Sequence, residues 1–302
     1  MIAGTCEPGF EAVRAAFAEN FRLRGETGAA ICVTAGGRTV VDLWGGWTNA
    51  ARTAPWRPDT LVNIFSVGKG LLALLAARLA GTRQLEVDAP VARYWPDFAA
   101  AGKDAVTLGH LLSHQAGVPA VRRRLPPEAM FDWRLMTGAI AAERPWWPPG
   151  TAHGYHVNTF GFAVGEVLRR VSGQRVGALL HEQVAGPLGA DVHIGLPAAE
   201  HGRVAEFDWP GVSPAEAEPA GLDDDRLMER NAYFNPAGLS GVGVINTSRW
   251  RQAEVPSANG HATARGIARV YARPRRRRLP RRRARRGLGG ARRRDMRAGL
   301  RP

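Results

Sequence analysis

The sequence predicts an α+β fold, in which an antiparallel sheet is flanked by helices and joined to a further helical region. Two patterns favour this class. Residues 28–34 and 39–44 are apolar, β-prone runs on either side of Gly36-Gly37, which is typical of a β-hairpin. Several other segments repeat apolar residues with the period of a helix.

The helical period predicts five helices, the first of them near the N-terminus. They cover residues 11–24, 66–81, 160–171, 176–184 and 262–272. Shorter helices are expected at 88–96, between an Asp88 cap and Pro96, and at 107–117, between a Thr107 cap and Gly117. Residues 119–150 are loop-rich by composition, and residues 197–230 are polar and rich in proline.

The charge of the chain divides it into two parts. The net charge is +14 over 302 residues, yet residues 273–302 hold 15 of the 41 basic side chains and only one acid. Residues 1–272 therefore carry 26 basic and 26 acidic side chains and are neutral. We expect one domain over 1–272, incomplete at its C-terminus, and an arginine-rich disordered tail over 273–302.

Two interpretations of the tail remain open. It is either a basic arm for nucleic acid or anionic lipid, or a disordered end without a role. The tail has no aromatic residues on which bases could stack, so no specific nucleic-acid partner is expected.

Other sequence signals concern the compartment. No run of about 18 apolar residues is present, so no membrane span is expected, and no secretory signal is visible at the start. Two cysteines, Cys6 and Cys32, do not make a disulfide framework. A cytoplasmic location fits best.

The candidate nucleophile lies in the run Ile64-Phe65-Ser66-Val67-Gly68-Lys69-Gly70, which opens an apolar helix. Ser66 and Lys69 would lie on one face of that helix, one turn apart. A serine hydroxyl needs a neighbouring base to become nucleophilic, and a partly buried lysine with a lowered pKa is such a base. The helix N-terminus would help to stabilise an oxyanion. A serine at this position is also a common helix N-cap, so both interpretations stand.

The segment Asp59–Gly70 resembles the nucleophile segment of serine β-lactamase-related hydrolases, including class C β-lactamases, DD-peptidases and family VIII carboxylesterases. Further matches follow in order along the chain, over roughly residues 10–272: Glu86–Val91 with Tyr94-Trp95-Pro96, Thr107–Gly117, Pro148-Pro149-Gly150 leading to Tyr155, Gly165-Glu166-Val167 with Val171-Ser172-Gly173, and Gly186-Pro187-Leu188-Gly189. The resemblance implies a β-lactamase/transpeptidase-like fold.

The resemblance also implies roles for three residues. Ser66 matches the acylated nucleophile, Lys69 the base that activates it, and Tyr155 the tyrosine whose phenol shares the proton transfer. Class C enzymes have an asparagine two residues after that tyrosine, where this sequence has Val157, with Asn158 one residue further. This departure favours the esterase relatives.

Other candidate site residues are given structural roles. His110 and His114 have a spacing seen in metal sites, but without a third ligand they are interpreted as structural histidines. The Trp146-Trp147 pair either lines a substrate cleft or packs beneath a loop.

The third motif of the family, a Lys-Thr-Gly or His-x-Gly triad on a late strand, does not occur after Ala272. The late strands of the sheet are also missing from the pattern, which leaves only the hairpin at 28–45. We therefore expect a truncated or frame-shifted relative of longer family members.

Three functions follow as alternatives. The first is a serine hydrolase that acts on a small-molecule ester, or on an amide or β-lactam, through an acyl-enzyme on Ser66, impaired by the missing motif. The second is a catalytically degenerate relative, and the third is a nucleic-acid binder that acts through the tail. No cofactor is expected, because this chemistry needs none.

Overall fold

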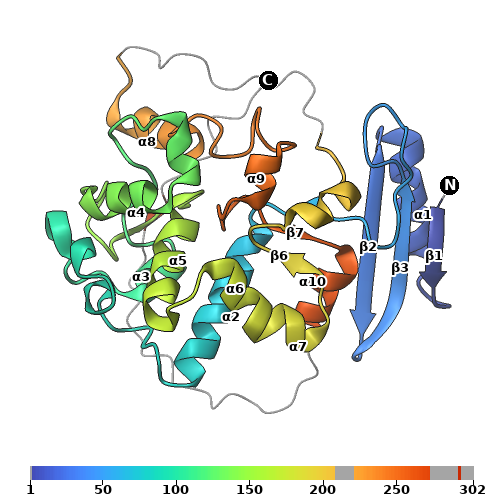
Figure 1. Ribbon diagram of the computed structural model, residues 1–302, viewed down its shortest axis with the longest axis horizontal. Helices are drawn as coiled ribbons and strands as arrows, with labels where there is room; N and C mark the ends of the chain where they lie inside the picture. The colour runs from blue at the N-terminus through green and yellow to red at the C-terminus, as the bar shows by residue number, and fades with distance from the viewer. Residues whose placement is uncertain (1, 208–220, 273–291, 294–302) are drawn as a thin grey trace.

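The computed structural model describes residues 2–207, 221–272 and 292–293 of the chain. An antiparallel sheet with a helix on its outer side forms one end of the molecule, and helices with short strands form the rest (Figure 1). The expected α+β class, with helices and antiparallel sheets, is confirmed.

The sheet at this end has the strand order β1-β3-β2. Strands β2 (Gly28–Ala35) and β3 (Arg38–Gly46) are the predicted hairpin. Gly36 and Gly37 have φ values of 57° and 83° at its turn, a region of backbone space that favours glycine. Strand β1 (Ile2–Cys6) pairs with the other edge of β3 and was not predicted, because five residues carry too short a pattern.

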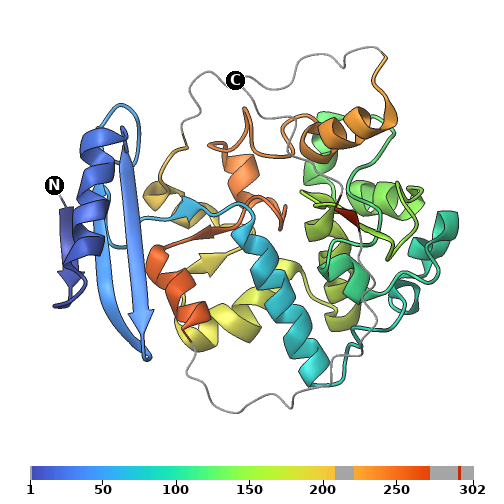
Figure 2. The same cartoon turned by 180° about the vertical axis from the view of Figure 1, so that it is seen from behind.

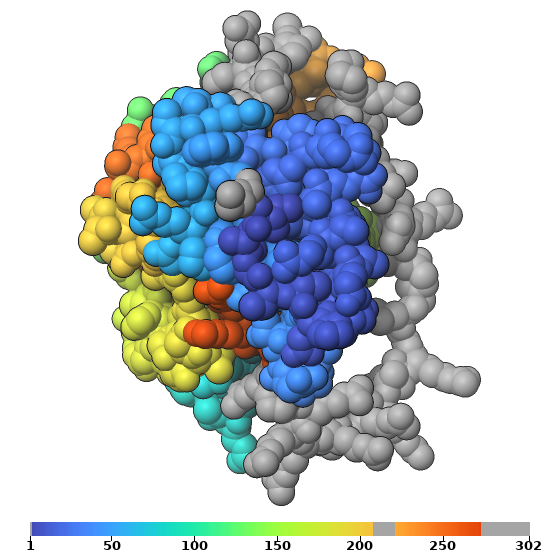
Figure 3. All heavy atoms as spheres, turned by 90° about the vertical axis from the view of Figure 1, so that its right-hand side faces the viewer, coloured from blue at the N-terminus to red at the C-terminus, as the bar shows by residue number. Residues whose placement is uncertain are grey.

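Two helices pack against this sheet. Helix α1 (Glu11–Leu23) buries Phe17 against Val41 and Leu43 of β3. Helix α10 (Ala264–Tyr271) contacts β2 on the side that faces the helical part of the molecule (Figure 2). Figure 3 shows the N-terminal residues covering this end of the molecule, with part of α10 exposed beside them. Within the described residues, β2 pairs with no strand other than β3.

A second small sheet lies near the centre of the molecule (Figure 1), and its strand β4 leads into the candidate site. It consists of β4 (Val62–Asn63), β7 (His261–Ala262) and β6 (Val192–His193) in the antiparallel order β4-β7-β6. A third, two-stranded parallel pair joins β5 (Ala152–His153) to β8 (Arg292–Arg293).

The main hydrophobic core surrounds helix α2 (Val67–Gly81) and helix α5 (Thr159–Ser172). Leu71, Leu72 and Leu75 of α2 are all at most 1% exposed. Helix α6 (Val176–Leu180) follows α5 and continues through the π-helical turn η4 (His181–Ala185) into α7 (Gly186–Leu188). The helices expected at 11–24, 66–81, 160–171, 176–184 and 262–272 are thus present within a few residues of their predicted ends.

Two short helices differ from their predictions. At 88–96 the structure has only a 3₁₀ turn, η1 (Val91–Arg93), which begins after the extended Pro90 rather than at Asp88, followed by η2 (Pro96–Gly102). Thr107 does cap α3 (Leu108–Leu112), but the helix ends well before Gly117. His114 adopts a φ of 59°, and this left-handed conformation turns the chain away from the helix axis.

Several helices were missed, most of them in the segments 119–150 and 197–230, which are loop-rich or polar and rich in proline. Helix α4 (Trp133–Ala142) lies within the loop-rich 119–150, between η3 (Pro127–Phe131) and the Pro145–Pro149 run, and Asp132 caps it. The nearby prolines masked its short apolar period. Helix α8 (Asp224–Phe234), η5 (Ala198–Arg203) and α9 (Ser248–Gln252) were also missed, since their sequences are polar.

The predicted arginine-rich tail at 273–302 lies outside the described residues, apart from 292–293. The position after Ala272 where the late strands and the third motif would occur is likewise outside them. Among the described residues, no helix is both long enough and apolar enough to cross a lipid bilayer.

Candidate active site

Ser66 stands at the junction between the small central sheet and helix α2. Strand β4 ends at Asn63, and Ser66 occupies the N-cap of α2. Its side chain makes no capping hydrogen bond, so the hydroxyl is not used as a helix cap. The preceding Phe65 has a φ of 45°, which is rare for a bulky residue and indicates local backbone strain at the candidate nucleophile.

Lys69 lies one helical turn after Ser66, as its spacing predicted. Its Nζ is 3.1 Å from Ser66 Oγ and donates a longer, 3.4 Å hydrogen bond to the carbonyl oxygen of Ser257. The residue is only 8% exposed. Burial lowers the pKa of Lys69 to about 7, because the charged ammonium loses its hydration. A substantial fraction of the amine is therefore neutral near pH 7 and able to accept a proton.

Tyr155 approaches the same hydroxyl from the loop between β5 and α5. Its phenol donates a 2.7 Å hydrogen bond to Ser66 Oγ. The Nζ of Lys69 lies 4.8 Å from the centre of the tyrosine ring. The structure thus brings the three predicted site residues, Ser66, Lys69 and Tyr155, together around a single oxygen atom.

Two histidines, the half-buried His114 and the fully buried His156, hold the loop that carries Tyr155. The backbone N–H of His156 donates to His114 Nδ1 at 3.1 Å, and the His114 ring lies 5.0 Å from the Tyr155 ring, centre to centre. His156 Nε2 accepts from the Val118 N–H at 3.0 Å, which leaves its Nδ1 to donate to the Gly154 carbonyl at 2.6 Å. Sequence reasoning treated His114 as structural and did not single out His156.

Both histidines remain neutral at physiological pH. Burial, with a smaller contribution from the Lys69 charge, lowers the pKa of His114 to about 4. Burial also lowers the pKa of His156 to about 3, since the fully buried ring cannot be hydrated in its charged form. Neutral rings place no positive charge next to Lys69. They also keep His114 Nδ1 and His156 Nε2 available as hydrogen-bond acceptors.

The segment at Pro256–Ser257 closes the site on the side of Lys69. A Cβ atom on Gly68 would lie 2.2 Å from the Pro256 carbonyl oxygen, and one on Gly161 would lie 2.4 Å from the Ser257 nitrogen. Only glycine permits this approach of α2 and α5 to the segment. Ser257 was missed in the sequence, because its part in the site is played by a backbone carbonyl that any residue carries.

The other residues considered in the sequence have structural contacts. Asn158 is 1% exposed and donates to the Ala232 carbonyl and to Ser240 Oγ, which ties α5 to α8 and the loop after it. Trp146 Nε1 donates to the Ala120 carbonyl under the guanidinium of Arg122. Trp147 is 4% exposed and packs on His156.

The spacing of His110 and His114 does not create a metal site. His110 completes a capping box with Thr107, while His114 accepts from the His156 N–H. Across the described ranges, no group of three or more His, Cys, Asp and Glu side chains is placed to hold a metal ion.

Comparison with known proteins places this geometry in a family. The Beta-lactamase family model matches residues 13–301. An "Esterase/beta-lactamase LipL" of Mycobacterium tuberculosis is 36% identical over 278 residues, which cover 89% of this chain and 63% of the relative. "Esterase EstB" of Burkholderia gladioli is 30% identical over 63% of this chain and 52% of its own. The chain thus spans between half and two thirds of these two relatives.

Solved structures agree with these relatives. A family VIII carboxylesterase shares 43% sequence identity at a TM-score of 0.79, over 90% of this chain and 70% of its own. A penicillin-binding protein homologue from Caulobacter crescentus shares 42% identity at a TM-score of 0.80, over 89% of this chain and 70% of its own. Since the family model covers nearly the whole sequence and the fold agrees with these structures, the chain belongs to the beta-lactamase family.

Proposed function

We propose that this chain is a serine hydrolase that cleaves a small-molecule carboxylic ester through an acyl-enzyme on Ser66. The observation that carries the proposal is the pair of contacts to Ser66 Oγ, at 3.1 Å from Lys69 Nζ and 2.7 Å from the Tyr155 hydroxyl. These distances are within the reach required for proton transfer to and from a nucleophile.

Acylation begins when Ser66 Oγ attacks the ester carbonyl carbon while the neutral amine of Lys69 accepts the hydroxyl proton. The carbonyl oxygen becomes an oxyanion, to which the Ser66 N–H at the start of α2 donates. Tyr155 then passes a proton to the departing alcohol and recovers it through Lys69. Water, activated by the same pair, attacks the acyl-enzyme, and the carboxylic acid leaves as Ser66 recovers its proton.

An ester is preferred to a β-lactam or amide on two grounds. The asparagine of class C enzymes has no counterpart at Val157, and the neighbouring Asn158 is committed to Ala232 and Ser240. Two of the relatives reported above carry the word esterase in their names, and a third is a family VIII carboxylesterase. Amide and β-lactam substrates remain the alternative within the same mechanism.

We further propose that turnover is impaired, with 1–272 as the hydrolase domain and 273–302 as a separate tail. No Lys-Thr-Gly or His-x-Gly triad follows Ala272, and such a triad would provide a second oxyanion donor. Loss of one oxyanion donor typically costs about 10²–10³ in rate. A fully degenerate relative is the limiting case of this proposal.

The test is covalent labelling of the purified full chain with a fluorescent fluorophosphonate, and in parallel with a fluorescent penicillin. We expect fluorophosphonate labelling that Ser66→Ala abolishes and that Ser113→Ala preserves. Ser113 is a matched control because its hydroxyl donates only to backbone carbonyls of α3, those of Gly109 and His110. A chain that unfolds cooperatively but takes up neither label would contradict the hydrolase and support the degenerate relative.

A further inference from the structure

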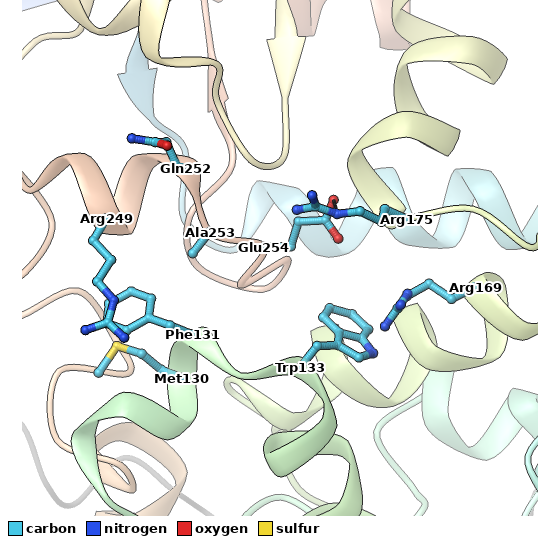
Figure 4. A pocket seen from close by; sticks show the side chains of 9 residues that line it. All are labelled: Met130, Phe131, Trp133, Arg169, Arg175, Arg249, Gln252, Ala253 and Glu254. Carbon is cyan, nitrogen blue, oxygen red and sulfur yellow. Dashed lines mark ion pairs between the residues drawn. The ribbon is translucent and has the colours of Figure 1, made fainter.

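A hollow of about 610 Å³ lies on a part of the surface that includes none of the candidate active-site residues (Figure 4). Its walls come from the end of η3 and the start of α4, from α5, from the residue before α6 and from α9 with the segment after it. The aromatic and charged side chains of its lining are Phe131, Trp133, Arg169, Arg175, Arg249 and Glu254. We call this hollow the arginine pocket.

Positive charge exceeds negative charge around the arginine pocket. The Arg175 guanidinium pairs with Glu254 at 3.4 Å, and Glu254 also accepts the Gly177 N–H. Arg169 lies 3.6 Å from Glu166, but that carboxylate makes its shorter contact, 2.7 Å, with Arg170. Arg170 also pairs with Asp97 at 3.8 Å, so Arg169 and Arg170 face two carboxylates and together add no net charge.

Arg249 is the source of the excess positive charge. Its guanidinium lies over the Phe131 ring at 4.2 Å, and no carboxylate in the described part of the chain forms an ion pair with it. In Figure 4 its side chain lies across the hollow from Arg169 and Arg175. A guanidinium that is held by a ring face keeps its N–H groups free to donate to an anion.

The Trp133 wall of the arginine pocket is fixed in orientation. The Trp133 Nε1–H donates a 2.6 Å hydrogen bond to Glu166, which locks the indole against rotation. Arg169 lies 4.8 Å from the centre of the Trp133 ring. The pocket therefore offers a flat indole whose position is already set beside an arginine, and ordering this indole on binding would cost little side-chain entropy.

We propose that the arginine pocket binds a small aromatic compound that carries a phosphate or carboxylate group. The ring would lie on the faces of Trp133 and Phe131. The anionic group would accept bidentate hydrogen bonds from Arg249 or Arg175, a geometry that suits both phosphate and carboxylate. This site is independent of the proposed hydrolysis, because none of its residues contacts Ser66, Lys69 or Tyr155.

The experiment is a titration of the full chain with phenyl phosphate and with benzoate, followed by the NMR signal of the Trp133 indole N–H. Trp133→Phe assigns that signal. We expect a saturable shift with one or both compounds, and a dissociation constant that Arg249→Gln raises by about tenfold, the loss of one charge-assisted hydrogen bond. Inorganic phosphate lacks the aromatic ring and phenol lacks the anionic group, so each should bind at least tenfold more weakly.

Arg22→Gln is the matched control, because it removes one arginine charge from the exposed surface of α1. It should leave the dissociation constant within twofold, and thermal unfolding midpoints should show that both variants remain folded. The proposal is overturned if neither compound shifts the signal, or if Arg22→Gln and Arg249→Gln weaken binding equally. Equal binding of phenol would also overturn it, because the arginines would then have no part in recognition.

Discussion

Tyr155 donates a 2.7 Å hydrogen bond to Ser66 although 89 residues separate them in the chain. The contact closes a triangle with Lys69, whose Nζ lies 3.1 Å from the same oxygen and 4.8 Å from the tyrosine ring. Each of the three groups is held by a different part of the fold: α2, its N-terminal junction, and the loop that His114 and His156 support. The predictions that follow test this arrangement and its supports.

Replacement of Tyr155 by phenylalanine removes the phenol and leaves the ring in place. We expect the rate of fluorophosphonate labelling at Ser66 to fall by about 10²–10⁴, the usual contribution of a positioned acid–base group. Stopped-flow or gel-based labelling kinetics measure this rate. Tyr94→Phe is the control, since its hydroxyl only accepts from the Glu86 N–H, and it should label at the unsubstituted rate.

The labelling rate should depend on pH through Lys69. Burial lowers the pKa of this amine to about 7, and only the neutral form accepts the serine proton. The rate should therefore be low at pH 5.5, rise through pH 7 and level off above pH 8. A pH–rate profile of labelling checks this. A rate that keeps rising up to pH 10 would show that the pKa of Lys69 is not lowered, and a rate that does not change between pH 5.5 and pH 10 would show that Lys69 is not the base.

Gly68 and Gly81 lie in the same helix but should respond oppositely to alanine. A Cβ atom on Gly68 would lie 2.2 Å from the Pro256 carbonyl oxygen, whereas the structure places no heavy atom within 4 Å of one on Gly81. Gly68→Ala should lower the free energy of unfolding by more than about 1 kcal/mol, the range of overpacked cores. Gly81→Ala should be neutral or raise it by up to about 1 kcal/mol. Urea unfolding of both variants measures the difference.

His156→Leu should destabilise the chain and slow labelling together. The substitution leaves the buried Val118 N–H without its acceptor, at a cost of about 1–3 kcal/mol in unfolding free energy. It also frees the loop that carries Tyr155. Thermal unfolding and labelling rates measure the two effects, with the exposed His181→Leu as the control. If His156→Leu slows labelling no more than His181→Leu, the loop is positioned by other contacts.

Much of the fold was predictable wherever a segment carried enough apolar period. Helix α2 has its run of buried leucines, and the hairpin has its Gly36-Gly37 turn. The failures were short or polar elements. Strand β1 has only five residues, and α8 buries three side chains along an otherwise polar helix. Their stability comes from contacts with other elements, which a local pattern does not record.

The candidate site likewise combines contacts that the sequence could predict with contacts that it could not. By itself the sequence determined that Ser66 and Lys69 share one helical turn, because a three-residue spacing on a helix has only one geometry. Tyr155 was expected from family resemblance alone. Only the tertiary structure decided that its phenol meets Ser66, that Ser257 presents a carbonyl to Lys69, and that His114 and His156 brace the loop. Packing between distant segments sets these contacts, and the same burial lowers the pKa of Lys69.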